Sequence, residues 1–166
     1  PIFSEYYQTI CRSTEQVGLG YISQLADRNL AESLATNRER DRILGYTSNG
    51  VHKDELEMTL NEQLIRRVGS QGQNKTYLIA LKLAQFAFLT RKGQTTPILL
   101  LDDIFDKLDA ARVAEIIKLV SGDSFGQIFI TDTNRKYLDE ILQAMNHDYA
   151  LFRVEQGEVQ PMEDQL

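Results

Sequence analysis

The stretch PILLLDD, residues 97–103, decides the fold, because a continuous apolar run follows a proline and is closed by two aspartates. Such a run is typical of a strand covered on both faces, as in a parallel sheet. Further along the chain we expect a helix over about 109–120, a strand over 127–131, a helix over about 135–145 and a last strand, at a sheet edge, over 149–154. This alternation predicts an α/β fold with a largely parallel sheet flanked by helices.

Two helices are expected before this stretch. Apolar side chains surround most of the segment 70–92, which predicts a helix that is buried on several sides and ended by Gly93. Asn29 and Glu32 fit a helix N-cap and its reciprocal partner, so a second helix should run over about 30–44. A short strand is expected over 17–22, and alternating apolar and polar residues predict a hairpin over 46–68.

The composition is that of one ordinary soluble domain. The chain has 166 residues, 42% of them hydrophobic, and a net charge of −6. Cys11 is the single cysteine, and no Cys/His cluster has metal-ligand spacing, so a reducing, cytoplasmic setting is expected. No apolar run is long enough to span a membrane and no export leader opens the chain, so no membrane partner is expected. Because the first residue is Pro1, we take the chain as part of a longer protein.

Against this acidic total, the segment 62–92 is basic, with six Lys and Arg and one Glu. A basic patch can face the phosphates of a nucleotide or a nucleic acid. It can equally be the solvated face of a helix. The sequence leaves both interpretations open.

Two neighbouring carboxylates, Asp102 and Asp103, directly follow the apolar strand. Ligands of open α/β sheets bind beyond the carboxyl ends of the strands. One carboxylate there can hold a divalent cation while the other takes a proton from an attacking water. The alternative is an acidic helix N-terminus that includes Asp106 and Asp109 and is stabilised by the helix dipole.

A loop with two glycines, Gly69-Ser70-Gln71-Gly72-Gln73, precedes the long helix. Ser70 suits an N-cap, the glycines let the backbone approach an anion, and the first N–H groups of the helix point the same way. A plain capped helix is the alternative. The spacing is not that of a P-loop, Gly-x-x-x-x-Gly-Lys-Ser/Thr, and that motif does not occur in the 166 residues.

Taken together, GSQGQNKT (69–76), ALKLA (80–84) and PILLLDDIFDKLD (97–109) closely resemble the C-terminal part of the RecF family. This family comprises bacterial DNA replication and repair ATPases related to the SMC and ABC-type heads. The segment TSNGVHKDEL (47–56) resembles the family's Gly-Pro-His-Arg-Asp-Asp segment, and residues 129–131 resemble the strand before its switch region.

The resemblance implies roles for the glycine-containing loop. Ser70, together with Gln71, Gly72 and Gln73, matches the ABC signature loop. In this superfamily that loop caps the γ-phosphate of an ATP held by the opposite subunit. Residues 69–73 are called the signature loop from here on.

The resemblance also implies roles for three aspartates. Asp102 matches the Walker B carboxylate that positions Mg²⁺, and Asp103 stands where the general base or water-orienting acid belongs. Asp109 matches the D-loop aspartate that crosses the dimer interface. The sequence departs from the family at the switch, where Thr131-Asp132 replaces the usual histidine.

For the intact protein, the resemblance implies ATP and Mg²⁺ as cofactors and an ATP-dependent homodimer. It implies binding to duplex DNA near single-strand gaps, and loading of RecA together with RecO and RecR. Residues 1–45 would be the end of a helical arm that returns to the head, and 46–166 the C-terminal part of a P-loop NTPase head. Because the family's P-loop lobe precedes the matched region, this chain alone is not expected to hydrolyse ATP.

Three other interpretations remain. A receiver-type phosphoacceptor domain would need a lysine after a late strand, whereas residues 152–154 contain none. A non-catalytic interaction module could use the acidic segment 93–166 as a docking surface. The head of another SMC or ABC-type DNA ATPase would be expected to show heptads in its arm, and residues 1–45 show none sustained.

Overall fold

The computed structural model describes residues 1–93, 95–103, 105–122, 124–133 and 149–162. Its helices are α1 (Ile2–Cys11), α2 (Leu30–Leu44), the short η1 (Val51–Lys53) and α3 (Ile65–Val68), α4 (Gln71–Lys92) and α5 (Ala110–Val120). Its strands are β1 (Val17–Ile22), β2 (Glu55–Leu60), β3 (Gln63–Leu64), β4 (Leu99–Asp102), β5 (Ile128–Thr131), β6 (Phe152–Glu155) and β7 (Glu158–Pro161). The helix expected over 135–145 lies outside the described residues.

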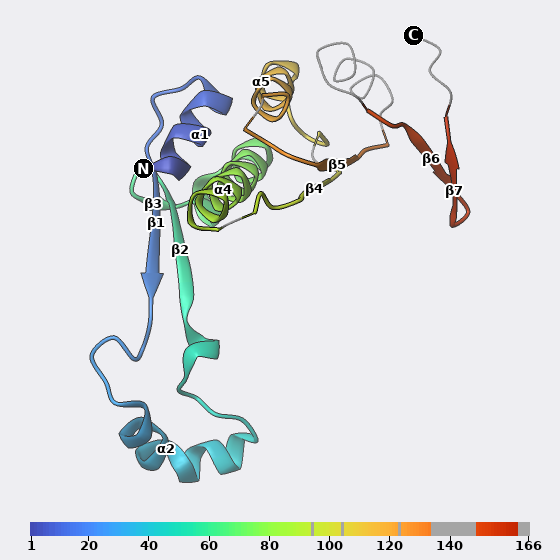
Figure 1. Cartoon of the computed structure of the whole chain (residues 1–166). Helices are drawn as coiled ribbons and strands as arrows, with labels where there is room; N and C mark the ends of the chain where they lie inside the picture. Colours follow the sequence, from blue (N-terminus) through green and yellow to red (C-terminus); the bar gives the residue numbers. More distant parts are fainter. Residues whose placement is uncertain (94, 104, 123, 134–148, 163–166) are drawn as a thin grey trace.

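The core forms around α4, against which the shorter helix α1 packs (Figure 1). Tyr77 and Leu83 of α4 are fully buried, as are Tyr7 of α1 and Ile116 of α5. We expected α4 to be buried on several sides, and the side that faces the core is buried. Its outer side is not, because Leu78, Phe88 and Leu89 there are about half exposed. Because α1 shares this core, the first residues of the chain pack on the head.

The strands β4 and β5 form the predicted parallel pair, in register from Leu99 opposite Ile128 to Asp102 opposite Thr131. Leu99 and Leu101 point into the core, whereas Leu100 between them is 64% exposed. The expectation that this strand is covered on both faces is wrong for the described residues. The reason is that the core lies on one face of the two-stranded sheet and leaves the other open.

The other strands pair antiparallel. Across its six residues β2 pairs with β1, from Val17 opposite Leu60 to Ile22 opposite Glu55, and only its end pairs with β3. The hairpin expected over 46–68 is thus reduced to a tight turn, in which Asn61 and Glu62 both adopt positive φ. The last predicted strand begins at Phe152 and pairs with β7 in a separate hairpin, not at the edge of the parallel pair.

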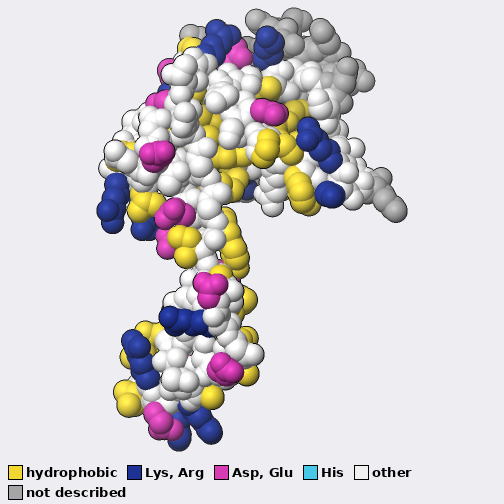
Figure 2. All heavy atoms as spheres, turned by 90° about the vertical axis from the view of Figure 1, so that its left-hand side faces the viewer, with side chains coloured by type: hydrophobic (Ala, Val, Ile, Leu, Met, Phe, Trp, Pro, Cys, Tyr) yellow, Lys and Arg dark blue, Asp and Glu magenta, His cyan; other side chains and the backbone are white. Residues whose placement is uncertain are grey.

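The strands β1 and β2 form a long ribbon, called the arm ribbon below, that projects from the head and carries α2 at its far end (Figures 1 and 2). The segment between the two strands, residues 23–54, is called the arm tip. The Asn29 side chain caps α2, as predicted, and Gly45, at φ 76°, ends the helix. No residue of α2 is buried, so its own caps hold this helix more than packing does.

Candidate functional site

The signature loop is ordered by a capping box at the start of α4. The Ser70 hydroxyl oxygen accepts a hydrogen bond from the Gln73 backbone N–H at 3.2 Å, and the Ser70 N–H donates to Gln73 Oε1 at 2.8 Å. This reciprocal pair is the arrangement expected for Ser and Gln three residues apart. Ser70 remains exposed, and its hydroxyl proton is free to turn toward a ligand.

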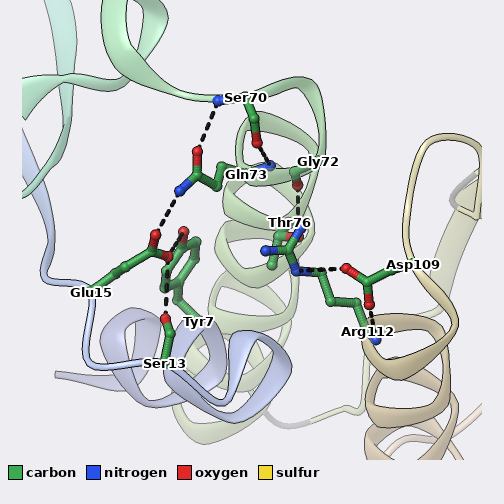
Figure 3. A network of polar contacts seen from close by, with 9 residues as sticks. All are labelled: Tyr7, Ser13, Glu15, Ser70, Gly72, Gln73, Thr76, Asp109 and Arg112. Atoms are coloured by element: carbon green, nitrogen blue, oxygen red, sulfur yellow. Dashed lines mark hydrogen bonds and ion pairs between the residues drawn. The ribbon is translucent and has the colours of Figure 1, made fainter.

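The opposite end of the Gln73 side chain contacts Glu15 in the segment after α1, and Glu15 in turn contacts α1 (Figure 3). Gln73 Nε2 donates to Glu15 Oε1 at 2.6 Å, and the other Glu15 oxygen accepts from Tyr7 at 2.9 Å and from Ser13 at 3.2 Å. Burial is the first cause that raises the pKa of Tyr7 above its ordinary value, and its bonds to Cys11 and Glu15 add to it. The sequence analysis missed Glu15, because no local pattern links residues 58 positions apart.

Gly72 brings the signature loop against the segment that contains Asp109. A Cβ at Gly72 would stand 2.8 Å from Arg112 Nη1 and 3.3 Å from the Lys107 carbonyl oxygen, so this close approach favours glycine. Asp109 caps α5 by accepting from the Arg112 N–H at 2.9 Å, and its carboxylate also pairs with the Arg112 guanidinium at 3.5 Å. The two predicted interface elements are therefore neighbours.

Asp102 and Asp103 lie at the end of β4, and Thr131 of the neighbouring strand joins them. The Thr131 hydroxyl donates to the Asp102 carboxylate, and the Asp103 N–H donates to the Thr131 carbonyl at 3.0 Å. Asp103 adopts φ 45°, a left-handed conformation that costs energy for a residue with a Cβ. Both carboxylates are exposed and precede α5 by several residues, so the acidic helix start applies to its N-cap Asp109 and not to them.

One side chain links this strand end to the signature helix. Lys75 in the first turn of α4 donates from Nζ to the Asp103 carbonyl oxygen at 2.5 Å. The structure thus brings the predicted site residues into two neighbouring groups: the signature loop with Asp109, and Asp102 with Asp103.

The donor chemistry at Asp102 fits a magnesium ion. Mg²⁺ prefers oxygen ligands and is often held by one or two carboxylates, with water and substrate phosphates completing its coordination. Asp102 and the Thr131 hydroxyl supply such oxygens. No group of three or more His, Cys, Asp and Glu that could hold a metal occurs among the described residues, so the protein oxygens seen here would form only part of a coordination shell.

The segment 47–56 spans the end of the arm tip and the start of β2, far from the signature loop along the ribbon (Figure 1). His52 Nε2 contacts the Thr47 carbonyl oxygen at 2.9 Å, and Asp54 accepts from the Tyr21 hydroxyl, which lowers the pKa of Asp54. A polar cavity of about 550 Å³ also lies at the tip, between the loop after β1, α2 and Ser48-Asn49. These contacts hold the two ends of the arm tip together and place none of its residues at the carboxylates.

The fold and the paired groups define the C-terminal part of a P-loop NTPase head of the ABC type. Curated relatives named "DNA replication and repair protein RecF" match nearly the whole chain. One from Parabacteroides distasonis is 82% identical, and the match covers 99% of this chain and 45% of the relative. One from Bacteroides thetaiotaomicron is 61% identical, and the match covers 98% of this chain and 44% of the relative. The chain belongs to the RecF family, and it corresponds to the C-terminal part of RecF.

The solved structures give the same fold. Those of the recombination mediator protein RecF in the RecFOR pathway, one with ATP and one with ATPrS, align with TM-scores of 0.67 and 0.68 at 22% identity. Each alignment covers 98% of this chain and 43% of the solved chain. No protein-family model matches the chain. The chain thus spans less than half the length of the relatives it matches. The matched fold excludes the alternative of a receiver-type phosphoacceptor domain.

No helix in the described part of the chain is both long and apolar enough to cross a membrane.

Proposed function

We propose that this chain supplies the signature loop to ATP held by a second subunit, within a RecF-type DNA repair protein that dimerises on ATP. The observation that carries this proposal is the position of Ser70. It is an exposed hydroxyl at the start of a helix of 22 residues, held by a capping box and next to the segment of Asp109.

The chemistry of the loop suits a phosphate. The first N–H groups of a helix have no intrahelical acceptor, and the helix dipole favours negative charge there. The capping box uses one lone pair of the Ser70 oxygen and leaves its proton, so Ser70 can donate to a phosphate oxygen. Lys75 is held on the Asp103 carbonyl, and its charge adds to the positive potential of the first turn.

Asp102 and Asp103 serve a second nucleotide, bound by the P-loop lobe of the same subunit. Asp102 would hold Mg²⁺, which neutralises phosphate charge when bound. Asp103 orients the attacking water or takes its proton. Asp109, beside the signature loop, reaches the partner subunit. The arm is best assigned to the ribbon and its tip rather than to all of residues 1–45, because α1 packs on α4.

The intact protein would bind duplex DNA near single-strand gaps and, with RecO and RecR, load RecA, and hydrolysis would then reset the dimer. The support is the family membership and the names of the relatives. The basic segment 62–92 divides between two roles. Lys75 serves the signature helix, and the exposed Arg67 is available to DNA phosphates, whereas its neighbour Arg66 pairs with Glu55 at 3.2 Å.

The test is ATP-dependent dimerisation of a full-length RecF polypeptide that contains this chain. Ser70→Arg should fill the γ-phosphate position and abolish the dimer seen by light scattering with ATP and Mg²⁺, while ATP affinity of the monomer persists. Gln85→Arg adds the same side chain to an exposed position of α4 and should dimerise normally. Normal dimerisation of the Ser70 variant would refute the proposal.

A further inference from the structure

Glu15 contacts the signature loop from outside it. Its carboxylate accepts from the Gln73 side-chain amide on one oxygen and from Tyr7 and Ser13 on the other. Hydrogen bonds to an ionised carboxylate are shorter and stronger than neutral ones, and the 2.6 Å bond from Gln73 fits that class. Three donors from three places in the sequence fix this one carboxylate (Figure 3).

The bond determines the direction of the Gln73 side chain. A glutamine amide has two chemically different ends, and both are used here: Oε1 accepts from the Ser70 N–H, and Nε2 donates to Glu15. If the amide turned over, two donors would face each other at Ser70, and an acceptor would face the Glu15 carboxylate. Glu15 therefore selects the amide orientation that the capping box needs.

The same face of α4 holds the base of the arm ribbon. Gln73 and Tyr77 are four residues apart and so lie on one side of the helix. Gln73 bonds Glu15, and the buried Tyr77 donates its hydroxyl proton to the carbonyl of Gly18 in β1. These two bonds lie on either side of the point where β1 begins, at Val17.

We propose that Glu15 is a positioning residue that fixes the Gln73 side chain and thereby couples the arm ribbon to the signature loop. This proposal rests on the proposed function of the signature loop. A displacement of the ribbon at its base moves Glu15 with the start of β1. The Gln73 amide follows Glu15, and the Ser70 N–H loses or regains its acceptor. The arm thus acts on the phosphate-facing loop without touching a nucleotide.

The test compares three acidic-residue variants in the full-length RecF polypeptide that contains this chain. Glu15→Ala removes the acceptor, and Glu15→Gln keeps one carbonyl oxygen that can accept from Gln73. Glu5→Ala removes an exposed carboxylate from α1 and serves as the matched control. Two readouts are measured: amide hydrogen exchange of residues 17–22 and 70–74, and the constant for ATP-dependent dimerisation.

Glu15→Ala should speed exchange in both segments together and weaken ATP-dependent dimerisation about tenfold, the size of one charge-assisted hydrogen bond. Glu15→Gln should recover most of the loss, and Glu5→Ala should behave as the wild type. In a Gln73→Ala background, Glu15→Ala should add little, because the two residues act through one bond.

Three results would overturn the coupling: unchanged exchange at 70–74, faster exchange there without faster exchange at 17–22, or losses from the two substitutions that simply add. The exchange readout needs no nucleotide, so it tests the contact even if the signature-loop function fails. A Ser70→Arg variant that still dimerises would instead refute that function and leave the exchange result standing.

Discussion

The ammonium group of Lys75 lies 2.5 Å from the carbonyl oxygen of Asp103, across 28 positions of sequence. This bond joins the helix that carries the signature loop to the end of the strand that carries both carboxylates. Asp103 is in a left-handed conformation. A non-glycine residue keeps such a conformation only when its surroundings hold it there. Lys75 is one of those holding contacts, together with the bonds from the Asp103 N–H to Thr131.

Lys75→Met should therefore lower ATP turnover of the full-length RecF polypeptide about tenfold and change ATP affinity little. The substitution frees the Asp103 backbone, so its carboxylate no longer stays aligned. Lys82→Met, which removes an exposed lysine two turns along the same helix, is the control and should keep wild-type turnover. Steady-state phosphate release measures both variants, and equal rates would show that the Lys75 bond has no role in hydrolysis.

Asp103→Asn should preserve ATP binding and ATP-dependent dimerisation but lower turnover by about 10²- to 10⁴-fold, the contribution typical of general acid–base catalysis. Asparagine tolerates the left-handed conformation, so the backbone should not change. Asp106→Asn alters an exposed carboxylate three residues away and should leave turnover unchanged. Turnover of the Asp103 variant within a few-fold of wild type would remove Asp103 from its assigned role.

The sequence predicted the elements that local chemistry determines. Asn29, Ser70 and Asp109 all cap helices as side-chain type and spacing predict, and the apolar runs at 97–101 and 127–131 pair in parallel. Residue patterns alone made Ser70, Asp102 and Asp103 candidates, each with a structural alternative, and only the resemblance implied a role for each, since an N-cap or an acidic pair alone is common.

Long-range contacts were beyond such reasoning. The main partner of β2 is β1, and only the end of β2 pairs with the adjacent β3, because pairing depends on the path of the chain and not on alternation alone. Glu15 gave no signal because its bond to the signature loop joins residues 58 positions apart. The run of three leucines in β4 has the same hydrophobicity on both faces, so it could not show that one face is open.

The two faces of β4 should respond differently to truncation. In the 166-residue chain, Leu101→Ala should cost about 2–5 kcal/mol of unfolding free energy, because the side chain is 2% exposed and its removal leaves a cavity. Leu100→Ala removes the same atoms from a side chain that is 64% exposed and should cost less than about 1 kcal/mol. Urea denaturation of both variants measures the difference, and similar costs would mean that the outer face is covered in solution.

Tyr7 should make the chain sensitive to alkaline pH. Burial, with hydrogen bonds to Cys11 and Glu15, raises the pKa of Tyr7 above its ordinary value of 10.0. Below that value both the folded and the unfolded chain keep the phenol proton, so its stabilising contribution is fully present. As the pH rises above it, the unfolded chain ionises first, and the unfolding free energy falls until the folded pKa is passed. Tyr6 and Tyr77 are shifted in the same direction and add to the decline.

Tyr7→Phe should be less stable at neutral pH, because Glu15 loses a donor, yet lose less stability between about pH 9 and 11. The measurement is the urea midpoint of both proteins across that pH range. Parallel curves of midpoint against pH would contradict a raised pKa of Tyr7.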